Sequence, residues 1–287
     1  MPTRPAFHAP QIARVLACLF FPPFLSVASA HWDSQLTTRA LWNSNVSNSD
    51  RSADVIGALQ FNADAVASRR IPLGTHDAIW AGAGLAAEAT PRFDDLGRAA
   101  IGPRLTWQHK FGLGAFVPIF GLELTADAVA ARDAARAGLA GSAALFCQQR
   151  LTPSTRVALT YNLARHAARE ALFDRTGGEI SGEITHDFDE RWRLTGSLSL
   201  RQGDVLSYAV PPRADLVPLA KIRQPVSTFG SPRIAYSLAA QSLEGGVALA
   251  HRWKSASVVF SYHYRETERH PLRYLNHLVS VTWMHQF

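Results

Sequence analysis

The residues of this chain that could do chemistry are arginines and carboxylates placed at every second position of several segments. In one segment Glu179, Glu183 and Asp187 alternate with apolar side chains, and in the next Arg193 and Arg201 do the same. A period of two puts the charges on one face of a β-strand and the apolar groups on the other. Such a charged face attracts anions, or its guanidinium and carboxylate groups pair with one another.

Alternation of this kind recurs along the chain and predicts the elements that position these charges. We expect twelve strands, at about residues 35–46, 54–64, 75–89, 96–111, 116–127, 136–149, 155–166, 177–188, 192–201, 233–253, 256–266 and 278–287. The segment 126–144 is rich in alanine, which would also suit an amphipathic helix. Pro118 indicates a bulge or the end of a strand, because proline cannot donate to the ladder.

The joins between the expected strands differ in length in a regular way. Joins after even-numbered strands are mostly short, and joins after odd-numbered strands are longer and more polar. The longer joins are expected at residues 47–52, 127–135, 167–176, 203–231 and 266–271. The join 68–74 departs from this pattern because it follows an even-numbered strand. The join 203–231 holds apolar residues, so we expect it to fold inward as a constriction, to pack against another loop, or to form a surface flap.

The last ten residues, LVSVTWMHQF, alternate aromatic and β-branched side chains with mostly polar ones and end on Phe287. This ending resembles the closing strand of bacterial outer-membrane β-barrels, although His285 stands where that family usually has an apolar residue or Tyr. The resemblance implies an all-β fold, a single transmembrane antiparallel up-and-down β-barrel of about 12 strands, with 10 or 14 as alternatives. It also implies a porin-like Gram-negative protein whose last strand binds the barrel-assembly machinery. A soluble β-sandwich is the alternative fold, since it also alternates.

Residues 1–30 have the pattern of a secretory signal peptide, with arginines before an apolar run and an Ala-Ser-Ala end. We expect cleavage after Ala30 and localisation in the bacterial outer membrane, which leaves residues 31–287 as one barrel domain. Cys147 is then the only cysteine, so no intramolecular disulfide is expected.

Composition argues against several classes of function. Residues 31–287 hold 27 basic and 23 acidic side chains, a net charge of about +4, and no Lys/Arg cluster of the kind that binds nucleic acid. No later stretch reaches the ~20 apolar residues of a transmembrane helix. The expected partners are outer-membrane lipid and lipopolysaccharide, the assembly machinery and small solutes, and no cofactor or metal is expected.

If the apolar face of each strand meets lipid, the other face lines the lumen. The candidate basic track consists of Arg98, Arg104, Arg136, Arg156, Arg193, Arg201, Arg233, Arg252 and Arg265. The candidate acidic partners are Glu123, Glu179, Glu183 and Asp187. This lining favours a narrow channel for passive passage of small hydrophilic solutes, with anions as the candidate class.

The alternative is a closed, non-conducting barrel with a structural or surface-interaction role. In that case carboxylates and arginines pair across neighbouring strands, namely Glu179, Glu183 and Asp187 with Arg156, Arg193 and Arg201. Catalysis is not expected, because Ser280 and His277 lie on opposite faces and cannot form a nucleophile–base pair.

Four even-numbered segments end on a His two residues before an aromatic side chain. The pairs are His109 with Phe111, His186 with Phe188, His251 with Trp253, and His285 with Phe287. The spacing would also suit a series of metal ligands, but an aromatic belt at the periplasmic rim explains it better. The expected rim residues are Trp107, Phe111, Phe188, Trp253, Trp283 and Phe287.

Overall fold

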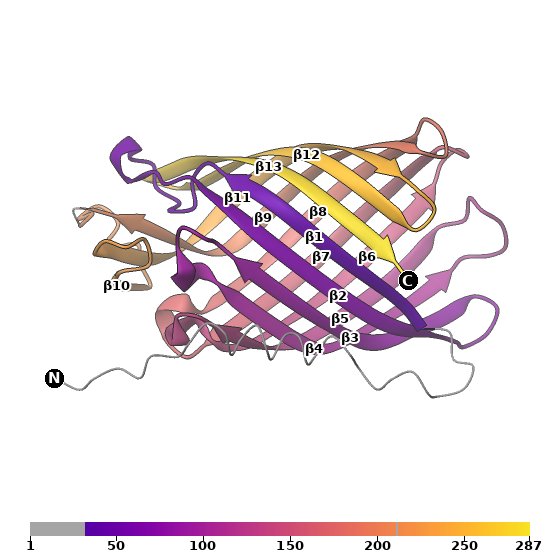
Figure 1. Cartoon of the computed structure of the whole chain (residues 1–287), viewed down its shortest axis with the longest axis horizontal. Coiled ribbons are helices and arrows are strands. Elements are labelled where there is room, and N and C mark those ends of the chain that lie inside the picture. Colours follow the sequence, from indigo (N-terminus) through magenta and orange to yellow (C-terminus); the bar gives the residue numbers. More distant parts are fainter. Residues whose placement is uncertain (1–31, 211) are drawn as a thin grey trace. The chain divides into compact units, whose positions relative to one another are not determined.

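The described residues form a single β-barrel. The computed structural model describes residues 32–210 and 212–287, and the predicted signal peptide, residues 1–30, lies outside them. Twelve antiparallel strands close into the barrel, and one short strand, β10, is added at one end (Figure 1). The strands are β1 (Trp32–Asn43), β2 (Ala58–Pro72), β3 (Asp77–Ala89), β4 (Arg98–Lys110), β5 (Ile119–Ala131), β6 (Gly138–Arg150), β7 (Thr155–Ala168), β8 (Arg175–Asp187), β9 (Trp192–Ala209), β10 (Ile222–Val226), β11 (Arg233–Arg252), β12 (Ala256–Arg269) and β13 (Leu272–Gln286).

The barrel closes because its first and last strands pair. β13 runs antiparallel to β1, with Gln286 opposite Gln35 and Leu278 opposite Asn43. The other wall strands pair with their neighbours in sequence, and β9 pairs directly with β11. β10 pairs with β11 alone. The closed ladder satisfies the backbone within the wall, which is the condition for a β-structure in lipid. Among the residues that the structure describes, no helix is long and apolar enough to cross a bilayer.

All twelve predicted strands are present, and the alanine-rich segment 126–144 is strand rather than helix. One difference from the prediction is at the start of β13, which begins at Leu272 and not at residue 278. Here the apolar residues Leu272 and Tyr274 are buried on the lumenal side. The apolar residues therefore change from the inner to the outer face along this strand. A prediction that assumes one apolar face for the whole strand misses its first six residues, 272–277.

Two joins are shorter than predicted. β2 continues to Pro72, so the join to β3 is only residues 73–76 and fits the pattern of short turns. The join after β12 is only residues 270–271, because both flanking strands extend toward it. Pro118 lies immediately before β5, and its position at a strand end confirms the expectation.

The two faces of the wall differ in polarity as the sequence predicts. Large apolar side chains project outward and are exposed, for example Leu105, Phe120 and Leu159. Inward positions carry polar pairs, such as the hydroxyls of Thr125 and Ser142, whose oxygens are 2.8 Å apart. An apolar outer band with a polar interior is typical of barrels that stand in a lipid bilayer.

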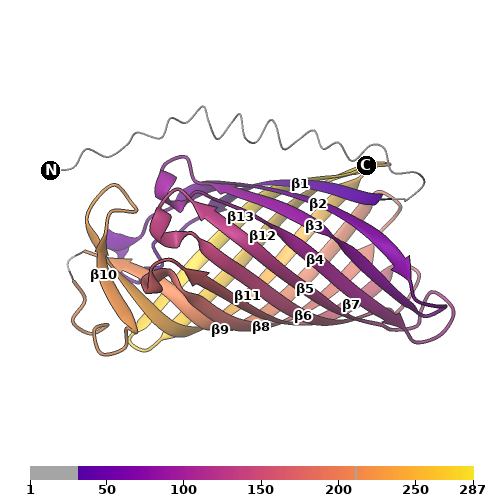
Figure 2. The ribbon, with the colours of Figure 1, turned by 90° about the horizontal axis from the view of Figure 1, so that it is seen from below.

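The joins after β1, β3, β5, β7, β9 and β12 lie at one end of the barrel, here called the loop end. The other joins, each of three to eight residues, lie at the opposite end, the turn end. The loop-end joins are L1 (44–57), L2 (90–97), L3 (132–137), L4 (169–174), L5 (210–232) and L6 (270–271). Each of the first four contains one 3-10 turn, and these are η1 (Ser52–Asp54), η2 (Asp94–Leu96), η3 (Ala134–Arg136) and η4 (Ala171–Phe173). Figure 2 shows β10 at the same end, beyond the wall strands.

Three of these loops interlock through their backbones. The amide of Arg132 in L3 donates to the carbonyl oxygen of Gly97 in L2 over 2.9 Å. The amide of Arg169 in L4 donates to the carbonyl oxygen of Ala137 in L3 over 2.8 Å. L2, L3 and L4 therefore form a connected row along the rim, in which L3 is bound to L2 and L4 is bound to L3.

L1 crosses the mouth of the barrel and contacts β9. The pairing of β9 with β8 ends at Gly203, and β9 continues without β8 to Ala209. L1 takes the place of β8 there, because the amide of Tyr208 donates to the carbonyl oxygen of Ser47 over 3.0 Å. The side-chain amide of Asn48 also donates to the carbonyl oxygen of Leu206 over 2.9 Å.

The extension of β9 and β11 separates two apolar clusters at the loop end. One face packs Leu206 and Tyr208 against side chains of the loop row that include Phe93 and Phe173. The other face belongs to a second cluster. That cluster consists of Ala209, Leu216, Tyr236, Leu238, Leu272 and Tyr274. The mouth is therefore filled by packed side chains of its own loops, and burial of this apolar area stabilises the closed arrangement.

Ion pairs connect L1 to L5. The guanidinium of Arg213, whose side chain is only 4% exposed, binds the carboxylates of Asp50 in L1 and Asp215 in L5. Its hydrogen bonds to Asp215 hold the pKa of that carboxyl below its usual range, and the two carboxylates raise the pKa of Arg213. The carboxylate of Asp54 in L1, 2% exposed, lies 3.3 Å from the guanidinium of Arg233.

Candidate lumenal chamber

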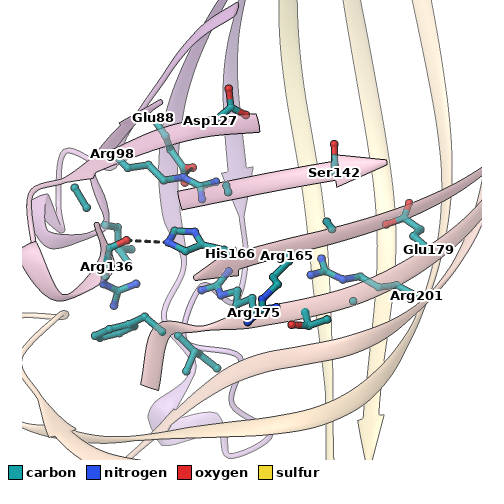
Figure 3. Close-up of a pocket in the computed structure, with 18 of the residues that line it drawn as sticks. Glu88, Arg98, Asp127, Arg136, Ser142, Arg165, His166, Arg175, Glu179 and Arg201 are labelled. Carbon is teal, nitrogen blue, oxygen red and sulfur yellow. Dashed lines mark hydrogen bonds and ion pairs between the residues drawn. The ribbon is translucent and has the colours of Figure 1, made fainter. Parts of the chain in front are cut away.

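A chamber of about 570 Å³ lies inside the barrel beneath the loops. Its lining comes from ten wall strands, β1 to β9 and β12, and from the inner surfaces of L1, L2, L3 and L4. Figure 3 shows the charged side chains that surround it, among them Arg98, Arg136, Arg175 and Arg201. The volume is in the range of small-molecule sites, roughly 300–1,000 Å³.

The lumenal register positions of the lining carry more positive than negative charge. The basic side chains there are Arg98, Arg136, Arg175, Arg201 and Arg265, and the acidic ones are Glu88, Asp127 and Glu179. Opposite residues in adjacent strands point to the same side, and the pairs Arg98 with Glu88 and Arg201 with Glu179 follow this rule. The chamber is therefore a polar space with a net cationic lining.

Three of these arginines are engaged by the protein. Arg98 pairs with Glu88 at 2.9 Å, and Arg265 pairs with Glu244 at 2.6 Å. Arg136 connects β9, L5 and L4 at the loop end. Its guanidinium donates to the phenol oxygen of Tyr208 and to the hydroxyl of Thr228, each over 3.0 Å, and lies 4.3 Å from the ring centre of Phe173.

Arg175 and Arg201 differ from these three, because neither forms an ion pair within the described parts of the chain. Arg201 stands opposite Glu179 across β8 and β9, and Arg175 stands opposite His166 across β7 and β8. The imidazole Nε2 of His166 lies 3.1 Å from the carbonyl oxygen of Arg136. Since a carbonyl oxygen only accepts, this nitrogen carries the proton when the ring is neutral.

The other members of the predicted basic track lie outside the chamber lining. Arg193 and Arg252 converge on Asp187 near the turn end, at 2.6 and 3.3 Å. Arg104 lies against Gly84, where a Cβ atom would be 2.0 Å from its Nε, so the placement of this side chain requires glycine at position 84. Arg233 pairs with Asp54 of L1 at the loop end, and Arg156 faces the part of the lumen near Asp187.

The structure forms one of the predicted ion pairs between neighbouring strands. Asp187 pairs with Arg193 at 2.6 Å. Across residues 32–210 and 212–287, Glu123, Glu179, Glu183 and Arg156 form no ion pair. A pair of opposite charges at facing positions is thus insufficient, because long side chains in a wide lumen extend toward solvent.

Arg175, His166 and Tyr208 contribute to the chamber, and the sequence had not identified Arg175 or Tyr208 as site residues. The predicted strand began at residue 177, which placed Arg175 in a loop. Counting back in steps of two from Glu179 would have placed it on the charged face. Tyr208 belongs to the part of β9 that extends past the predicted strand end.

The four predicted His–aromatic pairs are in contact at the turn end. Ring centres are 4.6 Å apart for His109 and Phe111 and for His285 and Phe287, and both pairs are edge-to-face. The other two pairs, His186 with Phe188 and His251 with Trp253, have the same geometry at 5.1 and 4.6 Å. In the described part of the chain, no group of three His, Cys, Asp or Glu side chains could hold a metal ion.

The segment 203–231 packs against another loop, which is one of the three arrangements expected for it. Its first residues extend β9, residues 222–226 form β10, and Leu216 is fully buried. The loop that reaches across the mouth is L1, which the sequence showed only as a polar join. Its Asn45, Ser47 and Asp54 are polar yet buried and hydrogen-bonded, so hydrophobicity gave no signal.

No protein-family model and no curated protein sequence matches this chain. Solved structures of membrane barrels do match. An outer membrane channel from Pseudomonas putida F1 is 9% identical, with a TM-score of 0.58, and the match covers 93% of this chain and 99% of that one. The KdgM porin in complex with disordered oligogalacturonate is 12% identical, with a TM-score of 0.46 and coverage of 88% and 99%.

The toluene transporter TodX of Pseudomonas putida is 10% identical, with a TM-score of 0.42 and coverage of 94% and 92%. Sequence identities this low show a similarity of fold alone. The strand pairing of this chain independently shows the same fold, a closed barrel of twelve strands. The chain therefore has the fold of a closed antiparallel barrel of twelve strands, similar to the fold of the outer membrane channel from Pseudomonas putida F1.

Proposed function

We propose that the protein is a narrow channel that passes small hydrophilic solutes passively and favours anions. The observation that carries this proposal is the chamber of about 570 Å³ inside the barrel, whose lining includes Arg175 and Arg201, two arginines with no ion pair among the described residues. Unpaired guanidinium groups lower the electrostatic barrier for an anion, as charged rings do in other anion pores. The polar pairs of the inner wall, such as Thr125 with Ser142, offer hydrogen bonds to hydrated solutes.

The proposed setting is the bacterial outer membrane, reached after signal-peptide cleavage at Ala30. The loop end would face the exterior and contact lipopolysaccharide, and the turn end would face the periplasm, with its aromatic rim at the membrane surface. The last strand, ending on Phe287, would bind the barrel-assembly machinery.

The channel is tested by reconstituting the purified barrel in planar bilayers. We expect discrete conductance steps, and under a KCl gradient a reversal potential of the sign that indicates chloride selectivity. The double variant Arg175→Gln with Arg201→Gln should shift the reversal potential toward zero. A cation-selective wild-type pore would contradict the preference for anions.

The competing function is a closed, non-conducting barrel, and the packed loop end favours it. Two apolar clusters and the buried side chain of Arg213 fill the mouth. The two functions are separated by removing residues 210–225, which carry part of that packing. A folded variant that shows no conductance, like the wild type, would establish the closed barrel.

A further inference from the structure

We propose that the chamber contains a binding site for a small polyhydroxylated carboxylate, such as a sugar acid, centred on Arg175 and Arg201. This inference names a ligand class for the proposed channel, and it rests on the proposed channel function because the ligand has to enter through the pore. Binding itself is a property of the chamber and can be measured without conduction.

The first observation is the state of the two guanidinium groups. In the chamber lining Arg98 binds Glu88 and Arg265 binds Glu244, whereas Arg175 and Arg201 form no ion pair in the described chain. Two guanidinium groups in one lumen repel each other, and a carboxylate between them removes that repulsion. Their planar donor forks also match a carboxylate bidentately.

The second observation is a hollow in the wall between the two arginines. The inward position between Arg175 and Glu179 on β8 is Gly177, and its partner on β9 is Gly203, two residues from Arg201. Ala164 stands opposite Gly177 on β7. A Cβ on Gly203 would lie 2.6 Å from the Cα of Gly177, so the close approach of these strands requires glycine. The wall carries no side chain at these two positions, and Arg201 reaches over it, with its Nε 3.8 Å from the place where a Cβ of Gly177 would stand.

The third observation is the set of neutral partners around the hollow. The hydroxyls of Thr125 and Ser142, the amide of Asn162 and the phenol of Tyr208 all line the chamber. With Nε2 of His166 donating to a backbone carbonyl oxygen, its Nδ1 is left to accept from a ligand hydroxyl. Such groups recognise hydroxyls, which bare inorganic anions do not carry.

The acidic residues of the chamber select against a highly charged ligand. Glu179 faces Arg201, and Asp127 also lines the space, so a multiply charged anion meets repulsion from both. The same carboxylates accept hydrogen bonds from the hydroxyls of a singly charged ligand. One carboxylate with several hydroxyls satisfies both kinds of lining group at once.

The test is isothermal titration calorimetry on the folded full-length barrel in detergent. D-glucuronate, D-glucose and inorganic phosphate are titrated in separate experiments. We expect D-glucuronate to bind, and D-glucose and phosphate to bind at least about tenfold more weakly. Arg175→Gln and Arg201→Gln should each weaken D-glucuronate binding by about tenfold, since each removes a charge-assisted hydrogen bond. Heat-dependent gel mobility verifies that each variant is folded.

The matched control is Arg70→Gln. Arg70 shares the inward parity of β2 but lies at the turn end, against Trp80. It changes the net charge of the lumen equally, so D-glucuronate affinity should change less than twofold. An equal loss in the control would overturn the site, because it would assign binding to the overall field of the lumen.

Two other results would also overturn the site. Phosphate binding as tight as that of D-glucuronate would show that the hydroxyl contacts contribute nothing, and a folded wild type that binds none of the three probes would leave no site. Conductance is recorded separately on the same preparation. Binding without conductance refutes the channel and keeps the site, whereas conductance without binding keeps the channel and refutes the site.

Discussion

The backbone amide of Tyr208 in β9 donates a 3.0 Å hydrogen bond to the carbonyl oxygen of Ser47 in L1. L1 follows β1, and β1 is separated from β9 in the wall by β13, β12 and β11. The bond therefore joins two segments that are distant in the wall. L1 therefore continues the hydrogen-bonding of the wall across the mouth. The predictions below follow from this arrangement and from the contacts that hold it.

Shortening L1 should open the mouth. Replacing residues 47–52 by two glycines removes the bond to Tyr208 and the carboxylate of Asp50, so we expect single-channel conductance to rise severalfold in planar bilayers. Replacing the join 111–118 at the turn end by a shorter one is the control for a change in loop length. An unchanged conductance in the L1 variant would show that L1 does not limit passage.

Arg213→Ala should loosen L1 from L5. The substitution leaves Asp50 and Asp215 without their cation, and since both carboxylates keep some contact with solvent we expect a loss of about 2 kcal/mol in the local stability of the loops. Protease cleavage within L5 of the folded protein would measure it. Arg223→Ala, which changes an exposed side chain of β10, should leave the cleavage rate unchanged.

The same contact predicts a response to acid. The pKa of Asp215 is lowered by its hydrogen bonds to Arg213, so its stabilising effect is fully present above the ordinary Asp pKa, near 4. It is lost as the pH falls through the lower pKa of the closed state. Wild-type conductance should therefore be constant between about pH 5 and 8 and rise below about 4. A rise beginning near pH 6 would instead assign the response to a histidine.

Arg136→Ala should destabilise the barrel more than a neighbouring loop substitution does. It removes hydrogen bonds to Tyr208 and Thr228 and the stacking on Phe173, which together should cost about 2–3 kcal/mol. The unfolding midpoint in urea measures this difference. Arg132→Ala is the control, because the side chain of Arg132 is 43% exposed and pairs with Asp94 only at 3.8 Å, and it should change stability by less than about 0.5 kcal/mol.

Deleting Phe287 should reduce assembly in cells far more than it reduces stability. Phe287 contacts His285 and its amide donates to the carbonyl oxygen of Ser34 over 3.0 Å, so few contacts of the folded barrel depend on it. The folded fraction in outer membranes, read from heat-dependent mobility, should fall severalfold. Normal assembly of the deletion variant would argue against recognition of the last residue by the assembly machinery.

The wall of the barrel was predictable because every strand has the same two environments, one on each face. An outward lipid face and an inward polar face impose a period of two, and residues such as Leu105 and Arg104 reveal it directly. The prediction failed where that condition ends. Leu272 and Tyr274 face inward against packed loops, so the rule that apolar residues face outward is reversed there.

The mouth and the chamber were less predictable, because their contacts join distant segments. Arg136 and Arg201 carry the same charge and both line the chamber. Arg136 is held by Tyr208 and Thr228, whereas Arg201 forms no ion pair within residues 32–210 and 212–287. Which arginine is engaged depends on how L1 and the extension of β9 meet. No local pattern in residues 44–57 encodes that meeting, since buried polar side chains in a loop resemble exposed ones in the sequence.

The continuity of L1 with the wall has a kinetic consequence. A pore closed by a single side chain fluctuates on the timescale of rotamer exchange, nanoseconds or faster. Here the hydrogen bonds of Tyr208 and Leu206 to Ser47 and Asn48 of L1 have to break together with the packing around them. That is local unfolding, with dwell times of roughly microseconds to seconds. Single-channel current records should therefore show discrete, long-lived sublevels in place of fast flicker. The lifetimes of these sublevels would give the rate at which L1 separates from β9.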